Sequence, residues 1–241
     1  MRAPPPLRGG LAARVSVLLG GLFLFACGIV ALLESGLGLA PWDVLHEGIA
    51  HQTPLSFGVA NVVVSVVVVT LAAVLGADLG LGTVANAVLV GAFVEILTAV
   101  DVLDLVDGPL PHRVGLLVLG LVLMGAGTGL YLGADLGAGP RDSLMVVGAR
   151  RTPFRIGAVR ATLEIAVLGA GFALGGTVGV GTVIFALGIG PSVELSFWLL
   201  ARSPLARGGQ DGLRYPQDDR HLVARELLVD HYEVIEPRES G

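Results

Sequence analysis

Two short motifs of the sequence place a carboxylate shortly after a proline. In the first, Asp43 follows Pro41, and in the second, Arg141 and Asp142 follow Pro140. Proline suits the first turn of a helix, where an acid also complements the positive end of the helix dipole. We expect each motif to begin a short helix whose free N–H groups can meet a solute. Simple capping of a helix at the membrane surface is the alternative, which the sequence leaves open.

A second candidate for chemistry is a pair of opposite charges inside an apolar stretch. Arg160 and Glu164 are four residues apart and therefore share one face of a helix. Asn61 and Ser65 occupy the matching positions 99 residues earlier. A charge in a membrane helix costs about 3 kcal/mol on insertion scales, so such residues pair or face a polar cavity. We predict that Arg160 binds an anionic group and that Glu164, or a glutamate matched between the two copies, carries a coupling proton; mutual neutralisation that joins helices is the alternative.

Other polar residues of the apolar stretches give weaker signals. Glu95 and Glu194 match each other near the ends of their stretches, where the helix dipole disfavours an acid, so pairing with arginine or proton transfer stays open. We interpret Trp42 as an aromatic anchor at the membrane surface. His46 and His51 are interpreted as ordinary interface residues rather than metal ligands.

These residues belong to two copies of one segment. Residues 11–100 align with residues 110–199 at an offset of 99 without a gap, and 29 of the 90 pairs are identical. Shared composition alone would give roughly a tenth, so the chain contains an internal duplication. Duplicated membrane proteins often have a symmetric core with interrupted helices, as many transporters do.

Six apolar stretches, three in each copy, are long enough to cross a bilayer, which takes about 20 residues. They are Val15–Leu33, Ser56–Leu75, Leu81–Val100, Val114–Leu132, Ile156–Leu174 and Val180–Leu200. Each copy also has a shorter piece, at 41–50 and 140–149, that would rise only about 15 Å as a helix. We therefore predict an all-α polytopic membrane protein of two repeats, each with three transmembrane helices and one short re-entrant or interfacial helix.

Arginine placement predicts the orientation of the spans. Arginines cluster before the first span, between the fourth and fifth, and after the sixth, whereas the other connections hold few. The positive-inside rule then places both termini in the cytoplasm. Because three spans are an odd number, the second repeat enters from the opposite side, which gives an inverted topology. The alternative makes the short pieces full spans, with eight helices and parallel repeats, but it puts the charged region 134–155 partly in lipid.

Composition agrees with a membrane protein. The 241 residues are 54% hydrophobic and 15% charged, with a mean hydropathy of +0.80, against about a quarter charged in soluble domains. Residues 201–241 alone hold 14 of the 35 charged residues. The single cysteine, Cys27, excludes an intrachain disulfide. The predicted organisation is a cytoplasmic segment 1–10, repeat 11–100, external acidic loop 101–109, repeat 110–200 and cytoplasmic tail 201–241, in which Asp218–Ile235 is compatible with a short amphipathic helix.

Several of these motifs together resemble a known bacterial family. They are the run at 40–46, the run at 139–142, the Arg160 and Glu164 pair, and the Gly-Val-Gly-Thr run at 179–182. As a set they resemble the YczE/YitT-like integral membrane proteins over about residues 11–200. The resemblance implies a multi-pass protein of the bacterial inner membrane and supplies no established activity.

The sequence as a whole predicts a small-solute transporter or permease with a site at the repeat interface. The glycine-rich runs at 76–83, 125–129 and 175–182 lie in apolar segments and lack the lysine of a phosphate-binding loop. We therefore expect ion-coupled or facilitated transport. We expect no cofactor and no nucleic-acid partner. We expect no enzyme activity, because the acids are spread over both sides of the membrane. The alternative is a non-transporting scaffold or regulatory protein that binds a partner. The predicted partners are the lipid bilayer and an unknown small solute or ion; a homodimer is compatible with the glycine-rich faces, although no pattern requires one.

Overall fold

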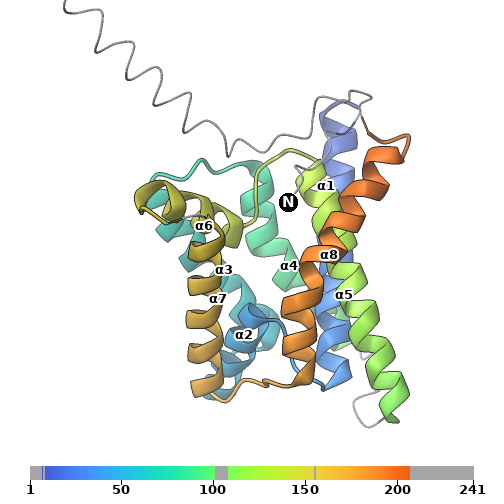
Figure 1. Cartoon of the computed structure of the whole chain (residues 1–241), viewed down its shortest axis with the longest axis vertical. Coiled ribbons are helices and arrows are strands. Elements are labelled where there is room, and N and C mark those ends of the chain that lie inside the picture. The colour runs from blue at the N-terminus through green and yellow to red at the C-terminus, as the bar shows by residue number, and fades with distance from the viewer. Residues whose placement is uncertain (1–6, 8, 101–107, 155, 207–241) are drawn as a thin grey trace, which may run out of the picture.

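The computed structural model describes residue 7 and residues 9–100, 108–154 and 156–206. Within this part of the chain the backbone forms eight α-helices and no strand beyond an isolated bridge between Leu7 and Ala206 (Figure 1). The helices are α1 (Leu11–Ser35), α2 (Pro41–Gln52), α3 (Phe57–Val74), α4 (Leu81–Ala99), α5 (Leu110–Gly133), α6 (Pro140–Arg151), α7 (Ile156–Ala173) and α8 (Val180–Arg202).

Six of these helices are long and apolar enough to cross a membrane, which confirms the six predicted spans and the all-α fold of the described residues. The two short pieces are also helices, α2 and α6, each of 12 residues and therefore about 18 Å long. Most of the predicted external loop and of the predicted tail, including the helix expected at 218–235, lies outside the described residues.

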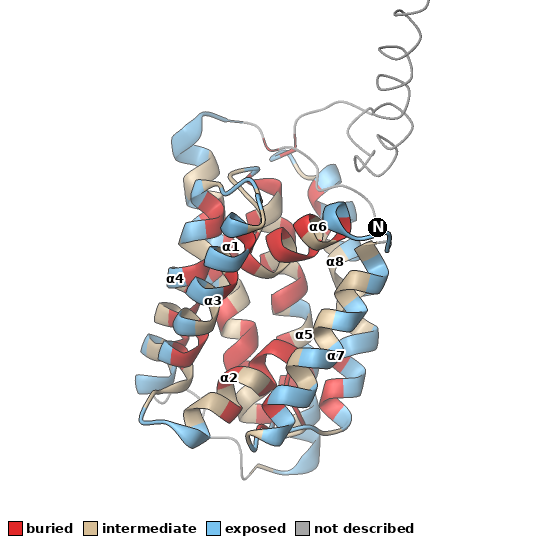
Figure 2. Cartoon of the chain, turned by 90° about the vertical axis from the view of Figure 1, so that its left-hand side faces the viewer, coloured by how far each residue is buried: buried red, intermediate tan, exposed pale blue. Residues whose placement is uncertain are grey.

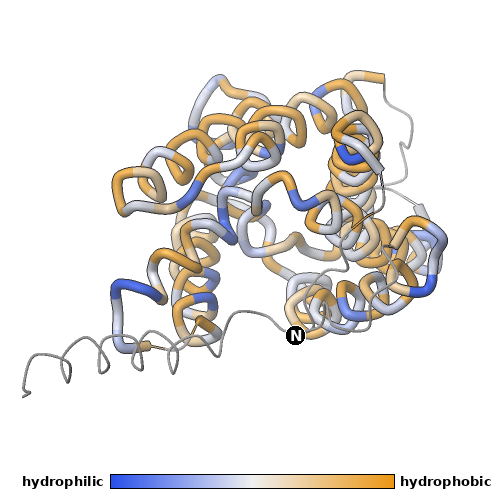
Figure 3. The backbone as a smooth tube through the Cα atoms, turned by 90° about the horizontal axis from the view of Figure 1, so that it is seen from above, coloured by the Kyte–Doolittle hydropathy of each residue, from blue (hydrophilic) through white to orange (hydrophobic). Residues whose placement is uncertain are grey.

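The outside of the bundle is apolar. Val74, Ile165 and Leu187 are 76, 70 and 75% exposed, an arrangement that water would disfavour and that lipid tails accept. Hydrophobic residues predominate along the helices (Figure 3), whereas the fully buried residues gather toward the middle of the bundle (Figure 2).

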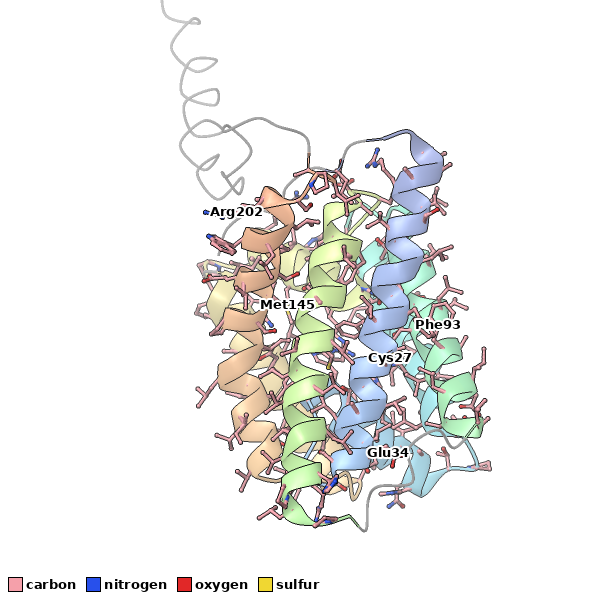
Figure 4. The ribbon with its side chains drawn as sticks, turned by 90° about the vertical axis from the view of Figure 1, so that its right-hand side faces the viewer. Cys27, Glu34, Phe93, Met145 and Arg202 are labelled. Atoms are coloured by element: carbon pink, nitrogen blue, oxygen red, sulfur yellow. The ribbon has the colours of Figure 1, made fainter. Side chains whose placement is uncertain are left out.

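The long helices α1 and α5 lie side by side and approach closely through glycines (Figure 4). A Cβ atom added to Gly28 would lie 2.5 Å from Met124 Cγ and 2.9 Å from Gly120 O, and one added to Gly127 would lie 2.6 Å from Gly21 O. Gly21 and Gly28 match Gly120 and Gly127 at the offset of 99, so both helices use the same two positions. Small residues of this kind allow membrane helices to pack backbone against backbone.

Two arginines at matching positions join the ends of these same helices. Arg14 Nε donates a hydrogen bond to Ala134 O at 2.7 Å, while Arg113 Nε donates to Ser35 O and its Nη2 to Gly36 O, both at 2.7 Å. The carbonyls at a helix end have no partner within the helix, so each arginine satisfies the end of the neighbouring helix. Because the start of each helix binds the end of the other, α1 and α5 run in opposite directions.

The loops after α1 and α5 also make matching contacts with the other half of the chain. Gly181 N–H donates to Leu37 O, and Gly82 N–H donates to Leu136 O, each at 2.7 Å. Both loops contain a glycine with positive φ, Gly38 in the first and Gly137 in the second, which lets the chain turn sharply before Pro41 and Pro140. Each glycine loop thus packs on the start of the last helix of the other half.

The remaining helices pack in nearly matching pairs. Helix α2 packs on α3 and α7, and α6 packs on α7 and α3, with α2 and α6 toward opposite ends of the bundle (Figures 1 and 2). Helix α4 packs on α1, and α8 packs on α5. The halves differ where α3 packs along α4, because α7 and α8 do not pack on each other in this way over their described residues.

Candidate functional site

A cavity of about 190 Å³ lies inside the bundle, and all eight helices contribute to its lining. The first residues of α2 and of α6 both reach it. Its charged lining residues are Arg141, Asp142, Arg160 and Glu164, and its other polar lining residues are Asn61, Ser65, Asn86, Thr128 and Tyr131. Aromatic rings complete it: Phe25, Trp42, Phe185 and Phe197. The cavity is therefore small, mixed in polarity and rich in charge for the interior of a membrane protein.

A buried polar group lies beside this cavity at the start of α2. Asp43, in the first turn, is fully buried, and His46 one turn later is 1% exposed. His46 Nδ1 lies 3.3 Å from Asp43 Oδ1 and 3.1 Å from Asn61 Nδ2 of α3. The Phe57 ring packs edge-on against the imidazole, with 5.8 Å between ring centroids. A carboxylate, an imidazole and an amide thus share one buried pocket.

Arg141 connects this group with the cavity. Its Nη2 lies 3.6 Å from Asp43 Oδ1, and its guanidinium lies 5.3 Å from the centre of the Trp42 ring. The side chain lines the cavity and is 26% exposed. The positive charge at the start of α6 therefore compensates the buried carboxylate at the start of α2, and an aromatic face adds a cation–π contact.

The second aspartate of the duplicated motif has a different environment. Asp142 lines the cavity, and its Oδ2 accepts a hydrogen bond from Tyr131 OH at 3.0 Å. Tyr131 comes from α5 and is 5% exposed. Asp43 and Asp142 match in sequence, but an arginine balances the first while a phenol hydroxyl binds the second.

The predicted charge pair of α7 also faces the cavity. Arg160 Nε lies 2.9 Å from Glu164 Oε1, and the side chains are 36 and 29% exposed. Both line the cavity. They neutralise each other along one helix, yet both remain within reach of a solute in the cavity.

Six of the eight residues singled out in the sequence come together here. They are Asp43, Asn61, Arg141, Asp142, Arg160 and Glu164. Glu95 and Glu194 do not line the cavity. Glu95 instead accepts a hydrogen bond from Ser56 Oγ at 2.6 Å and thereby ties α4 to the residue that caps α3.

Two interpretations of the sequence are wrong. Trp42 is not an anchor at the membrane surface: it is 5% exposed, lines the cavity and lies under Arg141. His46 is not an ordinary interface residue, because it is buried against Asp43. The signal for His46 was its position three residues after Asp43, on the same face of a helix.

Tyr131 is a cavity residue that sequence reasoning missed entirely. It carries no local signal, since its contact with Asp142 arises only when the turn between α5 and α6 brings the end of one helix to the start of the other. His51, the other histidine considered for metal binding, is exposed and contacts Gly175 O at 3.0 Å. No cluster of three or more His, Cys, Asp and Glu side chains that could hold a metal occurs among the described residues.

Residues 12–197 match the model of DUF6198, described as a family of unknown function. The chain belongs to this family. The match contains every residue of the cavity lining, from Phe25 to Phe197. The match therefore covers the cavity and the bundle up to Phe197 in α8, and residues 198–241 lie outside it.

Three curated bacterial proteins are similar to the chain. An uncharacterized protein of Haemophilus influenzae is 40% identical over 190 residues, which cover 79% of this chain and 86% of that protein. The uncharacterized membrane protein YczE of Bacillus subtilis is 31% identical over 182 residues, covering 73 and 82%. The uncharacterized protein YyaS of Bacillus subtilis is 29% identical over 131 residues, covering 53 and 64%. The relationship to YczE confirms the resemblance seen in the sequence motifs; no solved structure matches the chain.

Proposed function

We propose that this membrane protein is a small-solute transporter or permease whose binding site is the central cavity. One observation carries the proposal: two half-length helices, α2 and α6, bring their first turns to a cavity that is also lined by Arg141, Asp142, Arg160 and Glu164. Free N–H groups and the positive potential at helix starts, combined with charged side chains, form the solute sites of many secondary transporters. The sequence has no nucleotide-binding motif, so transport would be facilitated or driven by an ion gradient.

We further propose that the two halves are inverted-topology repeats. The identical pairs of the sequence support this, as does the odd number of spans in each half. The opposite directions of the matching helices α1 and α5 support it as well, together with the reciprocal contacts of Arg14 and Arg113. An axis in the membrane plane would relate the halves and pass near the cavity, which is where alternating access needs its binding site.

The arrangement in the cell follows from the same proposal. Arginine-rich connections favour a bacterial cell membrane location with both termini in the cytoplasm. The acids of the cavity are paired or hydrogen-bonded and serve, in this account, to bind and orient a solute rather than to catalyse a reaction. A homodimer stays a prediction.

The test is solute entry into liposomes that contain the purified protein. Light scattering would report osmotic entry for a panel of small carboxylates, amino acids and inorganic anions, and an entrapped pH-sensitive dye would report accompanying protons. We expect at least one solute to enter faster than in protein-free liposomes, and Arg160→Gln to remove that difference. Arg150→Gln is the matched control, because Arg150 pairs with Asp78 on the surface at 3.7 Å, away from the cavity.

The proposal would be contradicted if no solute entered faster than in protein-free liposomes. It would also be contradicted if Arg160→Gln and Arg150→Gln changed uptake equally. Either result would move the scaffold interpretation ahead of the transporter.

A further inference from the structure

Four polar atoms beside the cavity are buried and make no hydrogen bond. They are Trp42 Nε1, both carboxylate oxygens of Asp43, and His46 Nε2, although Asp43 Oδ1 lies 3.3 Å from His46 Nδ1. Buried polar atoms are almost always hydrogen-bonded, so a group of four that are not indicates a ligand or a function. Arg141, at 3.6 Å, compensates the charge of Asp43 without satisfying its oxygens.

We propose that Asp43 and His46 form a proton-binding site that Arg141 controls. While Arg141 lies over the carboxylate, its guanidinium supplies the compensating positive charge. When an anionic solute in the cavity draws Arg141 away, one proton from hydronium in the adjoining water binds the Asp43 and His46 pair as a unit and replaces that charge. One O–H bond of hydronium breaks and leaves water, and one O–H or N–H bond forms on the pair. The link to a solute rests on the proposed transport function, whereas the proton site does not.

Arg141 lies between the buried carboxylate of Asp43 and the cavity, where a solute would bind. It belongs to α6, whereas Asp43 belongs to α2, so movement of one half against the other changes their separation. Its side chain is 26% exposed and lines the cavity, while Asp43 behind it is fully buried. If an anion entered the cavity and Arg141 were its counter-charge as well as that of Asp43, one buried negative charge would have no compensating positive charge. A low-dielectric interior disfavours such a charge strongly. Uptake of a proton removes that charge.

The other ionisable groups around the pair already have partners. Helix α3 carries none. The remaining groups and their partners are Arg160 with Glu164, Asp142 with Tyr131, Glu47 with the backbone N–H of Thr177, and His51 with the carbonyl of Gly175. Arg150 and Arg151 lie at the far end of α6. Among the described residues, Arg141 is therefore the cation in contact with Asp43.

Trp42 offers a direct optical test, because its ring lies next to Arg141 and it adjoins Asp43 in the chain. The chain has two tryptophans, so Trp198→Phe leaves Trp42 as the sole reporter. We would titrate the fluorescence of this variant in lipid nanodiscs from pH 4 to pH 9. We expect one transition, abolished by adding Asp43→Asn or His46→Gln. Adding Arg141→Gln should move its midpoint to higher pH by at least one unit, a tenfold gain in proton affinity.

Glu95→Gln is the matched control, since it also neutralises an acid within the bundle but one that bonds Ser56 outside the cavity. It should leave the midpoint unchanged. Each variant would first be checked for a monodisperse elution profile and an unchanged helix signal in circular dichroism, and the two substitutions at the site test the pair independently. A transition that survives either Asp43→Asn or His46→Gln, a midpoint that Arg141→Gln does not raise, or the absence of any transition would overturn the proposal.

Failure of this proposal and of the proposed function can be told apart. Fluorescence that titrates as expected in a protein that moves no solute would retain the proton site and contradict the transporter. Solute flux that depends on Arg160 in a protein whose Trp42 does not titrate would retain the transporter and contradict the proton site.

Discussion

At position 61 the first half of the chain has an asparagine that bonds His46, and at the matching position 160 the second half has an arginine that pairs with Glu164. The first turn of α2 has Trp42 where that of α6 has Arg141, and these two side chains stack on each other. Where α1 meets α5 the halves are alike, because the arginines that bind helix ends and the glycines that join the two helices are the same residues at matching positions.

The comparison separates two kinds of residue. The contacts between α1 and α5 are made twice with the same side chains, whereas Trp42 and Arg141, and likewise Asn61 and Arg160, face the cavity with different side chains at matching positions. A duplicated scaffold with a divergent interior suits a solute, which is rarely symmetric itself. It follows that substitutions in the repeated contacts should affect stability, and substitutions in the cavity should affect function.

The largest loss of stability is expected at the contact of α1 with α5. In Gly127→Ala the new Cβ would lie 2.6 Å from Gly21 O and 2.7 Å from Phe25 N, backbone atoms that cannot turn aside. Overpacking of this kind costs about 3 kcal/mol, and thermal unfolding in detergent would show it. Gly115→Ala in the same helix is the control, because no atom lies within 4 Å of its added Cβ. Equal unfolding temperatures would show that the helices do not meet at Gly127.

An intermediate and equal loss is expected for Arg14→Gln and Arg113→Gln. Each removes charge-assisted hydrogen bonds to the carbonyls at a helix end, which are worth about 2 kcal/mol. The exposed pair of Arg150 with Asp78 should contribute less than about 0.5 kcal/mol, so Arg150→Gln serves as the comparison. Chemical unfolding followed by circular dichroism would rank the three variants. A large loss for one arginine and none for the other would break the proposed equivalence of the halves.

The smallest loss of stability, with a large loss of function, is expected when α7 is given the residues of α3. In Arg160→Asn with Glu164→Ser the partly exposed ion pair is removed as a unit, which should cost less than about 1 kcal/mol. Solute uptake should fall at least tenfold. Glu164→Ser alone should destabilise more than the double substitution, because it leaves Arg160 without its carboxylate. Uptake at the original rate in the double variant would show that the charge pair has no part in transport.

Local pattern was sufficient for the spans, because length and apolar composition mark helices that can cross a membrane, and for α2 and α6, because a proline begins each. It was also sufficient to mark Arg160 and Glu164, whose charges are rare in such segments. Local pattern failed for Trp42 and Tyr131, since aromatic residues suit lipid boundaries and cavities alike. Only the three-dimensional arrangement of the helices determines which of these two environments a given ring has. Glu95 shows the reverse case, because its match to Glu194 suggested a shared role while the structure places it beside Ser56.

The most direct test of the inverted repeats around the cavity is two-sided cysteine labelling. Cys27 would be replaced by Ala, and single cysteines would be placed at Thr53 and Thr152, exposed matching positions at the ends of α2 and α6. A membrane-impermeant maleimide would be added to intact cells and, separately, to inverted vesicles. We predict that Thr53→Cys is labelled from outside the cell and Thr152→Cys from the cytoplasmic side. Labelling of both from the same side would mean parallel repeats and would contradict the account.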